Sequence, residues 1–326
     1  QQKVMEILGV KDLNDLRTKI SALWEQIYQD NGKEISVLAN SLWLDKDINY
    51  QQEAMDILAY HYYTSVYQGD LGSDRTNKDI ANWLQNQAGG MFSNRTGKVN
   101  ITPNAMLALA STVYFQSQWS DKFSSSNNTE KPFHTADGDV TCTFMNKKLA
   151  EMNYYWAEDY GAVQLWLENG SSMWFILPDE GKTTKDVMED GSYMDMVLFD
   201  DWATSGEWQN SKYMKVNLSV PKFDVSSTQN LKEGLENLGV TDVFAAGANF
   251  SNITTDVPIF LAGANQSVRV EIDEEGVKAA TYIELPAAGA AAPPEEIIDF
   301  VLNRPFIFVI ANDNIPLFAG CVNNPQ

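Results

Sequence analysis

The titratable side chains of this 326-residue chain offer little for acid–base or metal chemistry. Only two histidines occur, His61 and His134, and neither lies in an HExxH motif, a triad-like context or a metal-ligand spacing. His61 is flanked by tyrosines, which is typical of a partly buried structural histidine. Adjacent carboxylates such as Glu274 and Glu275 usually form a solvated face. With no GxSxG and no phosphate-binding glycine motif either, the sequence disfavours an enzyme and predicts no metal and no cofactor.

The two cysteines, Cys142 and Cys321, belong to no CxxC or metal-spaced cluster. This excludes a disulfide framework and a structural zinc site. We interpret them as two separate thiols buried as small hydrophobic side chains, and a single disulfide between them is the alternative.

The charge of the chain excludes several classes of partner. Lys+Arg number 23 against Asp+Glu 44, which gives a net charge of −21 and leaves no basic surface for nucleic acid or an anionic membrane. The most apolar run, Phe300 to Ile310, is interrupted by polar residues and falls short of the roughly 20 apolar residues of a bilayer helix. Hydrophobic residues make up 44%, enough for a sizeable core. The chain begins at Gln1, so any targeting segment would already have been lost.

Apolar periodicity separates a helical first part from a strand-rich second part. From Gln1 to Tyr67 apolar residues recur at helical spacing, interrupted by a run from Ile35 to Leu44 that predicts a strand buried on both faces. Helices followed by many strands indicate an α+β fold rather than repeated βαβ units. The other predicted elements are helices over Ile80–Met91 and Leu231–Leu238 and strands over Leu107–Phe115, Ala162–Leu167, Ser172–Leu177, Met214–Val220, Val268–Ile272 and Phe306–Ala311.

The segment from Glu274 to Glu296 is the unusual part of the sequence. Its first half alternates with period two, which predicts a strand. Its second half, Ala287 to Pro294, contains only Ala, Gly and Pro, so we expect it to be exposed and accessible to proteases. The alternative interpretation is an ordinary edge strand followed by a flexible loop. The face of small or apolar residues in the first half comprises Val277, Ala279, Thr281, Ile283 and Leu285.

Motifs spread along the whole chain resemble those of the serpins. EIDEEG, a small-residue stretch, a Pro-Pro pair, NRPFIFVI and PLFAGCVNNP match the C-terminal signature of that family. Other motifs follow in family order, so the resemblance covers essentially all of the sequence. They include Asn40-Ser41-Leu42-Trp43, Asn82-Trp83, Thr96-Gly97-Lys98-Val99, Tyr114-Phe115, Trp174-Phe175-Ile176-Leu177-Pro178 and Pro221-Lys222-Phe223.

The resemblance implies a fold and a mechanism. The fold is α+β, with three β-sheets, surrounding helices and an exposed reactive-centre loop at about residues 274–296. We expect a single serpin domain over residues 1–326 that lacks the family's N-terminal helical segment. In this family a target protease cleaves the loop as a substrate. After acylation the loop inserts into the main sheet as a new strand, which distorts the protease before the ester hydrolyses.

The hinge of the loop has counterparts here. Glu274 matches the family's hinge acid and is followed by Glu275, and Gly276 gives the backbone freedom at the pivot. Insertion requires small or apolar residues on the face that becomes buried, and the set from Val277 to Leu285 meets this requirement. Departures from inhibitory members are Tyr282 and Ile283, where small residues are usual, and Pro286, which lacks a ladder donor.

Two further sites are implied near the main sheet. Trp119 matches the tryptophan beneath the entry point of the loop. Ser111 and Gln266 stand where the family usually has an Asn and a His whose hydrogen bond latches the two halves of the sheet. A Ser111–Gln266 hydrogen bond could replace that latch.

The family's spacing, sixteen residues on from the hinge acid, places the scissile bond at Ala290–Ala291, within two or three residues. Alanine fits a shallow apolar specificity pocket, so we expect elastase-like targets. Trypsin-like proteases need Arg or Lys, and none occurs between Lys278 and Arg304. The resemblance predicts a monomeric, secreted or cell-surface inhibitor of serine proteases, and the alternative is a non-inhibitory serpin acting as a binding or storage protein.

Overall fold

The computed structural model describes residues 2–87, 99, 101, 105–199, 210–245, 247–261, 265–277, 295–313 and 315–326. The chain forms two compact units. Unit 1 comprises Gln1–Asp30, Ile35–Phe115 and Ser226–Arg269, and unit 2 comprises Asn31–Glu34, Gln116–Val225 and Val270–Gln326. The expectation of one serpin domain over the whole chain stays a prediction.

The first sheet has the strand order β1-β2-β4-β12, and β3 pairs with β2 in parallel. Strand β4, Leu107–Gln118, begins in unit 1 and ends in unit 2. Strands β10, Phe223–Asn230, and β11, Asn265–Ile272, form a separate two-stranded sheet. The remaining strands of the first sheet are β1 Gln29–Asp30, β2 Ile35–Asp45, β3 Thr64–Gly69 and β12 Gly276–Val277.

The helices of unit 1 begin and end at the expected kinds of residue. Asp12 caps the second helix, because its carboxylate accepts hydrogen bonds from the backbone N–H groups of Asn14 and Asp15. The third helix ends at Tyr63, which is left-handed with φ 50°. The helices are α1 Gln2–Ile7, α2 Leu13–Ile27, α3 Gln52–Tyr62, α4 Asp74–Gln87 and α7 Lys232–Asn237, with a 3-10 turn η2 at Asp242–Phe244.

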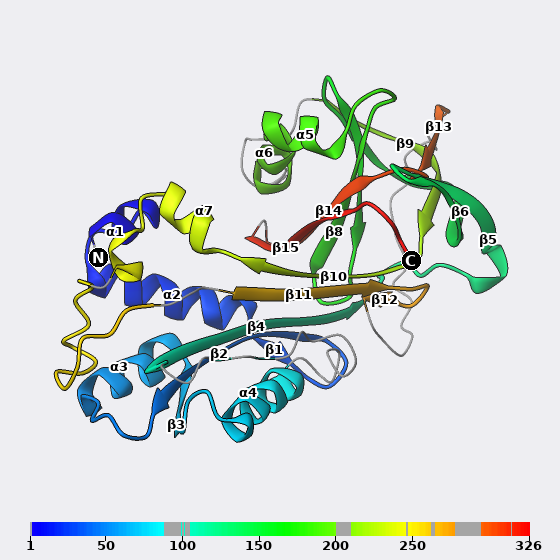
Figure 1. The fold of residues 1–326 in the computed structure, drawn as a ribbon. Helices are drawn as coiled ribbons and strands as arrows, with labels where there is room; N and C mark the ends of the chain where they lie inside the picture. Colours follow the sequence, from blue (N-terminus) through cyan, green and yellow to red (C-terminus); the bar gives the residue numbers. More distant parts are fainter. Residues whose placement is uncertain are drawn as a thin grey trace. The chain divides into compact units, whose positions relative to one another are not determined.

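Helix α4 lies along one face of the first sheet (Figure 1). Its apolar residues Ile80 and Trp83 recur at helical spacing and are buried against Trp43 of β2 and Ala108 of β4. The even-numbered side chains at the start of β4 therefore point toward α4. The odd-numbered face includes Leu109, which is 60% exposed.

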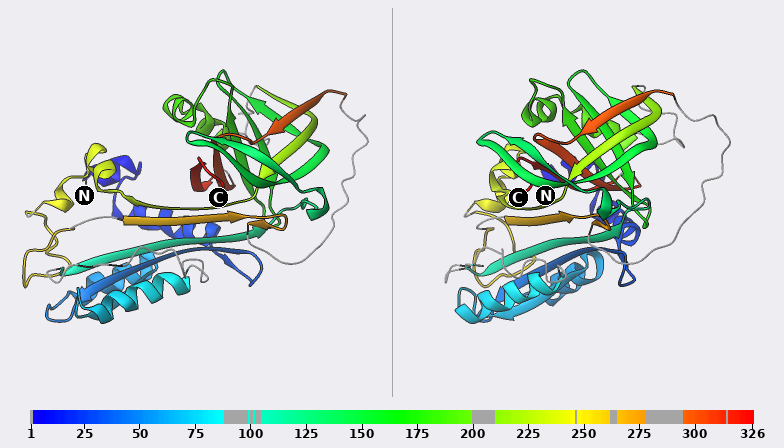
Figure 2. Two further views of the ribbon diagram at one scale, coloured as in Figure 1. Left: turned by 45° about the vertical axis from the view of Figure 1, so that its right-hand side comes forward. Right: turned by 90° about the vertical axis from the view of Figure 1, so that its right-hand side faces the viewer.

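Unit 2 is built on an eight-stranded, strongly curved sheet with the order β13-β9-β6-β7-β8-β14-β15 and β5 beside β6 (Figure 2). Every residue of β8 is buried, as are Phe306 to Ala311 of β14. Its strands are β5 Thr129–Thr135, β6 Gly138–Trp156, β7 Tyr160–Trp166, β8 Ser171–Pro178, β9 Ser211–Pro221, β13 Ile297–Val301, β14 Phe306–Asn312 and β15 Ile315–Val322.

Two apolar layers enclose β8 and β14. On one face Trp174 and Val309 pack with residues of helices α5, Thr184–Asp190, and α6, Ser192–Phe199. On the other face Phe306 and Phe308 lie near Phe223, with ring centroids 5.9 and 5.6 Å away. Burying both faces explains why these strands read as continuous apolar runs in the sequence.

The predicted α+β class is confirmed, and most predicted elements are present. The strand predicted over 35–44 is β2, and that over 107–115 is β4 with three more residues. The prediction of helix up to Tyr67 was wrong at its end, because Thr64 to Gly69 forms β3. Both cysteines are free thiols, Cys142 buried and Cys321 half-buried. Within the described ranges, every helix is too short or too polar to cross a bilayer.

Candidate functional site

The site is the junction between the end of β4 and the segment Asp273–Val277, called here the β4–β12 junction. Trp119 follows β4 directly and is 1% exposed. Its indole Nε1–H donates to the Asp273 carbonyl at 2.9 Å, and its backbone N–H donates to the Glu275 carbonyl at 3.0 Å. The neighbouring Phe123 N–H donates to the Glu274 carbonyl at 3.1 Å. Trp119 therefore contacts the predicted hinge through its indole and its backbone N–H groups, and its place beneath the entry point of the loop stays a prediction.

Gly276 and Val277 form strand β12, which pairs antiparallel with Gln118 and Ser117 of β4. Gly276 has φ +151°, a conformation that side chains rarely adopt. A Cβ atom there would lie 2.4 Å from the Ser117 carbonyl oxygen and 2.5 Å from the Gln118 Cα. Only glycine permits this approach of two backbones. The Val277 side chain next to it is 3% exposed, so the first residue of the predicted inserting face is already buried.

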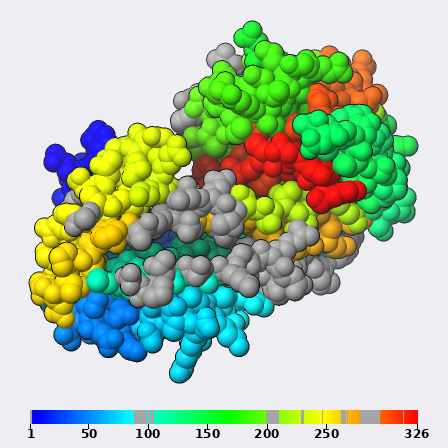
Figure 3. All heavy atoms as spheres, in the orientation of Figure 1, coloured from blue at the N-terminus to red at the C-terminus, as the bar shows by residue number. Residues whose placement is uncertain are grey.

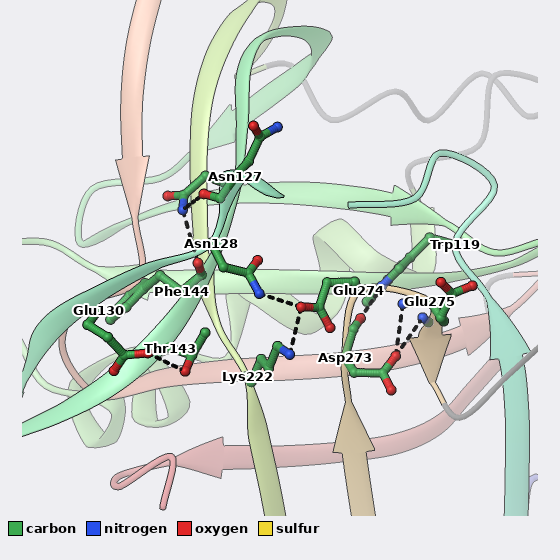
Figure 4. A network of polar contacts seen from close by, with 12 residues as sticks. Trp119, Asn127, Asn128, Glu130, Thr143, Phe144, Lys222, Asp273, Glu274 and Glu275 are labelled. Atoms are coloured by element: carbon green, nitrogen blue, oxygen red, sulfur yellow. Dashed lines mark hydrogen bonds and ion pairs between the residues drawn. The ribbon is translucent and has the colours of Figure 1, made fainter. Parts of the chain in front are cut away.

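Glu274 is the centre of a polar network (Figure 4). Its carboxylate pairs with the Lys222 ammonium at 2.6 Å and accepts a hydrogen bond from the Asn128 amide. Partial burial raises the pKa of Glu274, but the bonds from Lys222, Asn128 and its own backbone outweigh burial and lower the pKa overall. The charged form of Glu274 is thus the form that this network stabilises.

Glu275 is anchored separately. Its backbone N–H donates to Asp273 Oδ1 at 2.8 Å, and its side chain forms a 2.8 Å ion pair with Lys122. Asp273 Oδ1 also accepts from the Gly276 N–H at 3.3 Å. The turn from Asp273 to Gly276 is therefore fixed by its own side chains before the chain joins β4.

A buried carboxylate that the sequence did not single out lies beside the same end of β4. Glu34 is 8% exposed, and neither of its carboxylate oxygens makes a hydrogen bond of normal geometry with another described residue. Burial raises the pKa of Glu34, and the negative charge of Glu168 raises it further. Hydrogen bonding by Ser117 and the Gln118 backbone and the positive charge of Lys33 oppose this rise. The only local signal was the Asn-Gly-Lys turn that precedes it.

The side chains around Ser117 and Gln118 are also incompletely satisfied. Both amide atoms of the buried Gln118 and the Asn169 Nδ2 have no hydrogen-bond partner among the described residues. The Asn169 N–H donates to Ser117 Oγ at 3.4 Å, so this residue lies against the same strand end. Buried polar groups without partners each cost free energy. The β4–β12 junction is a costly part of the fold.

The remaining predicted site residues divide into two groups. Ser111 donates to Asn40 Oδ1 at 2.8 Å, and Gln266 is exposed on β11. The Ser111–Gln266 hydrogen bond that the sequence suggested stays a prediction. The other group lies outside the described residues and comprises Ala279, Thr281, Ile283, Leu285 and the reactive bond Ala290–Ala291.

Comparisons with known proteins agree on one family. The family model described as "Serpin (serine protease inhibitor)" matches residues 1–325. Alpha-1-antitrypsin of Meriones unguiculatus is 27% identical over 302 residues, which is 91% of this chain and 70% of that protein. The crystal structure of the thermophilic serpin tengpin in its native state has a TM-score of 0.80 at 26% identity, covering 96% of this chain and 79% of tengpin. A thyroxine-binding globulin complex with thyroxine has a TM-score of 0.77 at 22% identity, over 100% of this chain and 86% of that one.

Proposed function

Because the chain belongs to the serpin family, we propose that it is a suicide-substrate inhibitor of serine proteases. The protease serine attacks the carbonyl carbon of Ala290, the peptide bond to Ala291 breaks, and the new amine leaves with a proton. The protease then remains attached through an ester to Ala290. Insertion of the freed loop strand into the first sheet distorts the protease before water can cleave that ester.

The observation that carries this proposal is the pairing of β12 with β4. Gly276 and Val277 already occupy the first two positions of a strand antiparallel to β4. Continuing the same register would place Ala279 opposite Phe115 and Thr281 opposite Val113. The next inward residues, Ile283 and Leu285, would then lie opposite Ser111 and Leu109.

The face of β4 that would receive these side chains is suited to apolar neighbours. Directly opposed residues share a face of the sheet, so the set from Val277 to Leu285 would lie on the odd-numbered face of β4. Leu109 on that face is 60% exposed and would gain an apolar neighbour in Leu285. Each added ladder hydrogen bond contributes about 1 kcal/mol, so a strand of a dozen residues would add roughly 10 kcal/mol. This stabilisation is the source of the work done on the protease.

For the target we propose an elastase-like protease acting on a monomeric, secreted or cell-surface inhibitor. The small Ala290 side chain fits a shallow specificity pocket. A trypsin-like pocket binds the cationic side chain of Arg or Lys, which Ala290 does not provide. The sequence around Ala290 contains no larger residue from Ala287 to Ala292 that another pocket would prefer.

A second candidate, a non-inhibitory serpin that binds or stores another molecule, is favoured by one observation. Tyr282 is large at a position where inhibitory serpins usually have a small residue. Pro286 has no backbone N–H to donate to a neighbouring strand. In that case elastase would cleave the loop without being trapped.

The test is incubation of the full chain with pancreatic elastase, followed by a denaturing gel and mass spectrometry. A covalent complex and a released C-terminal fragment beginning at Ala291 are expected. A fragment beginning outside Gly289 to Pro293 would contradict the assigned bond, and complete cleavage without a complex would contradict inhibition. Ala290→Arg should transfer complex formation from elastase to trypsin, with the parent chain as the control that trypsin does not trap.

A further inference from the structure

The solvent-facing side of β6, β9 and β13 in unit 2 carries large hydrophobic side chains. Tyr213 of β9 is 55% exposed and Ile297 of β13 is 56% exposed. Ile297 pairs with Lys215, which lies two residues beyond Tyr213 on β9, so the three side chains share one face. We call this surface the β9–β13 face. The same face also carries Asn153 and Glu151 of β6, which pair with Tyr213 and Lys215, and Asn217 and Asp299, which pair with each other.

The β9–β13 face is rigidly held. Strand β13 begins against β9 through the Lys215 N–H, which donates to the Glu296 carbonyl at 3.0 Å. A 2.6 Å ion pair between Lys212 and Glu296 fastens the same point. Further along, the Asn217 amide donates to Asp299 at 2.8 Å. An exposed aromatic on a preorganised sheet loses little entropy when a partner covers it, which is typical of interface anchors.

The β9–β13 face lies close in sequence to the predicted reactive bond, and this closeness indicates which partner would cover it. Only Glu295 and Glu296 separate Ile297 from the last residue of the Ala, Gly and Pro stretch. Ala290 is seven residues before Ile297, and a fully extended chain of that length spans at most about 25 Å. A protease domain is roughly 40 Å across, so an enzyme bound at Ala290 reaches past Ile297. Figure 3 shows β13, in orange, at the surface of unit 2.

We propose that the β9–β13 face, with Tyr213 and Ile297 as its anchors, is a second docking surface for the protease that cleaves the loop. The inference rests on the proposed function only in requiring that a protease attacks the loop; it does not require trapping. The partner surface would be apolar with a hydroxyl or amide group for the Tyr213 phenol. Such a contact raises the rate at which a protease meets the loop and leaves insertion unchanged.

The experiment measures the second-order rate of loop attack by pancreatic elastase on the full chain. Covalent complex and cleaved chain are counted together, so the readout remains valid if the chain is a substrate rather than an inhibitor. The variants are Tyr213→Ser, Ile297→Thr and the double variant. Tyr60→Ser, which removes a 79% exposed tyrosine from unit 1, is the matched control. A free peptide of residues 278–294 gives the rate for the loop without the face.

The double variant should be attacked about tenfold more slowly than the parent, the loss expected from a small interface hot spot, with an unchanged melting temperature and an unchanged ratio of complex to cleaved chain. Tyr60→Ser and the free peptide define the background, and Tyr60→Ser should stay within twofold of the parent. Rates of the double variant within twofold of the parent would overturn the proposal. So would a parent dimer that the variants dissociate without a change in rate, because the face would then serve self-association.

Discussion

The layers around β8 and β14 and the β4–β12 junction are both buried in unit 2, yet they are built in opposite ways. Around β8 and β14 the buried side chains are almost all apolar and fill both faces of the sheet. At the β4–β12 junction the buried set includes Glu34, Ser117 and Gln118, and the side-chain polar atoms of Glu34 and Gln118 have no hydrogen bond of normal geometry within the described part of the chain. Burial of apolar side chains stabilises the first region. In the second region, burial of polar groups without hydrogen bonds offsets part of that stabilisation.

Under the proposed mechanism, this difference separates the residues that keep the protein folded from those that take part in insertion. An apolar core has one packed arrangement and resists rearrangement. A strand end with unsatisfied groups and a two-residue partner strand has free energy to gain from a different pairing. Substitutions in the two regions should therefore have different consequences, large for folding in one and large for insertion in the other.

The largest loss of stability is expected from the apolar layers. Phe308→Ala removes a ring that is 2% exposed and lies 5.6 Å from Phe223. It should lower the free energy of unfolding by about 3–5 kcal/mol, measured by urea denaturation. Phe308→Leu is the control and should lose less. If Phe308→Ala unfolds at the same urea concentration as the parent, the contrast between the two regions is wrong.

The next effect is on insertion rather than on folding. Val277→Arg would place an unpaired charge where a valine is 3% exposed, at a cost of several kcal/mol, and so expel β12 from the sheet. The variant should fold and be cleaved by elastase without forming a complex, and its melting temperature should not rise after cleavage. Val277→Ala keeps the site apolar and should still form complexes. Efficient trapping by Val277→Arg would exclude insertion as the mechanism.

A smaller and more local effect is expected at Gly276. Gly276→Ala adds a Cβ 2.4 Å from the Ser117 carbonyl, so the pairing must open at a cost of about 1–3 kcal/mol. Hydrogen exchange at the Trp119 backbone amide, which donates to Glu275, should speed up while exchange in β8 and β14 stays slow. Gly138→Ala, at φ +121° with open space around its Cβ, is the control for backbone strain alone. Equal exchange in Gly276→Ala and the parent would contradict the close approach.

The smallest effect concerns pH. Burial raises the pKa of Glu34, so its contribution to stability is fully present below the ordinary glutamate range near pH 4.3 and is lost as pH rises through the raised pKa. Glu34→Gln removes the ionisable group and should be more stable than the parent at neutral pH by on the order of 1 kcal/mol. The difference should shrink as pH falls toward 4. A difference that grows on acidification would show that the carboxylate is stabilised rather than strained.

Sequence alone predicted the parts that depend on local pattern. Strands with apolar runs, such as β2 and β8, were found because both their faces are buried. Strand β3 was missed because the tyrosines from Tyr60 onward continue a helical spacing, and only pairing with β2 makes Thr64 to Gly69 a strand. Pairing of that kind is set by residues about twenty positions away.

The candidate site shows the same limit. Gly276, Glu274 and Trp119 were recognised from motifs, but the ion pair of Glu274 with Lys222 joins residues far apart in the sequence. Glu34 resembles a surface residue in a polar turn, and its burial beside Ser117 and Gln118 depends on tertiary structure. Partners brought together by tertiary structure leave no periodicity to detect.

The two-residue ladder of β12 has a kinetic consequence. Starting a new strand is the slow step of strand formation, because backbone entropy is lost before burial compensates for it. With Gly276 and Val277 already fixed on β4, that nucleation occurs while the chain folds and not when a protease arrives. Under the proposed mechanism, only propagation, one residue pair after another, would be left for the short lifetime of the acyl ester. A preformed nucleus would therefore favour insertion over hydrolysis of the ester.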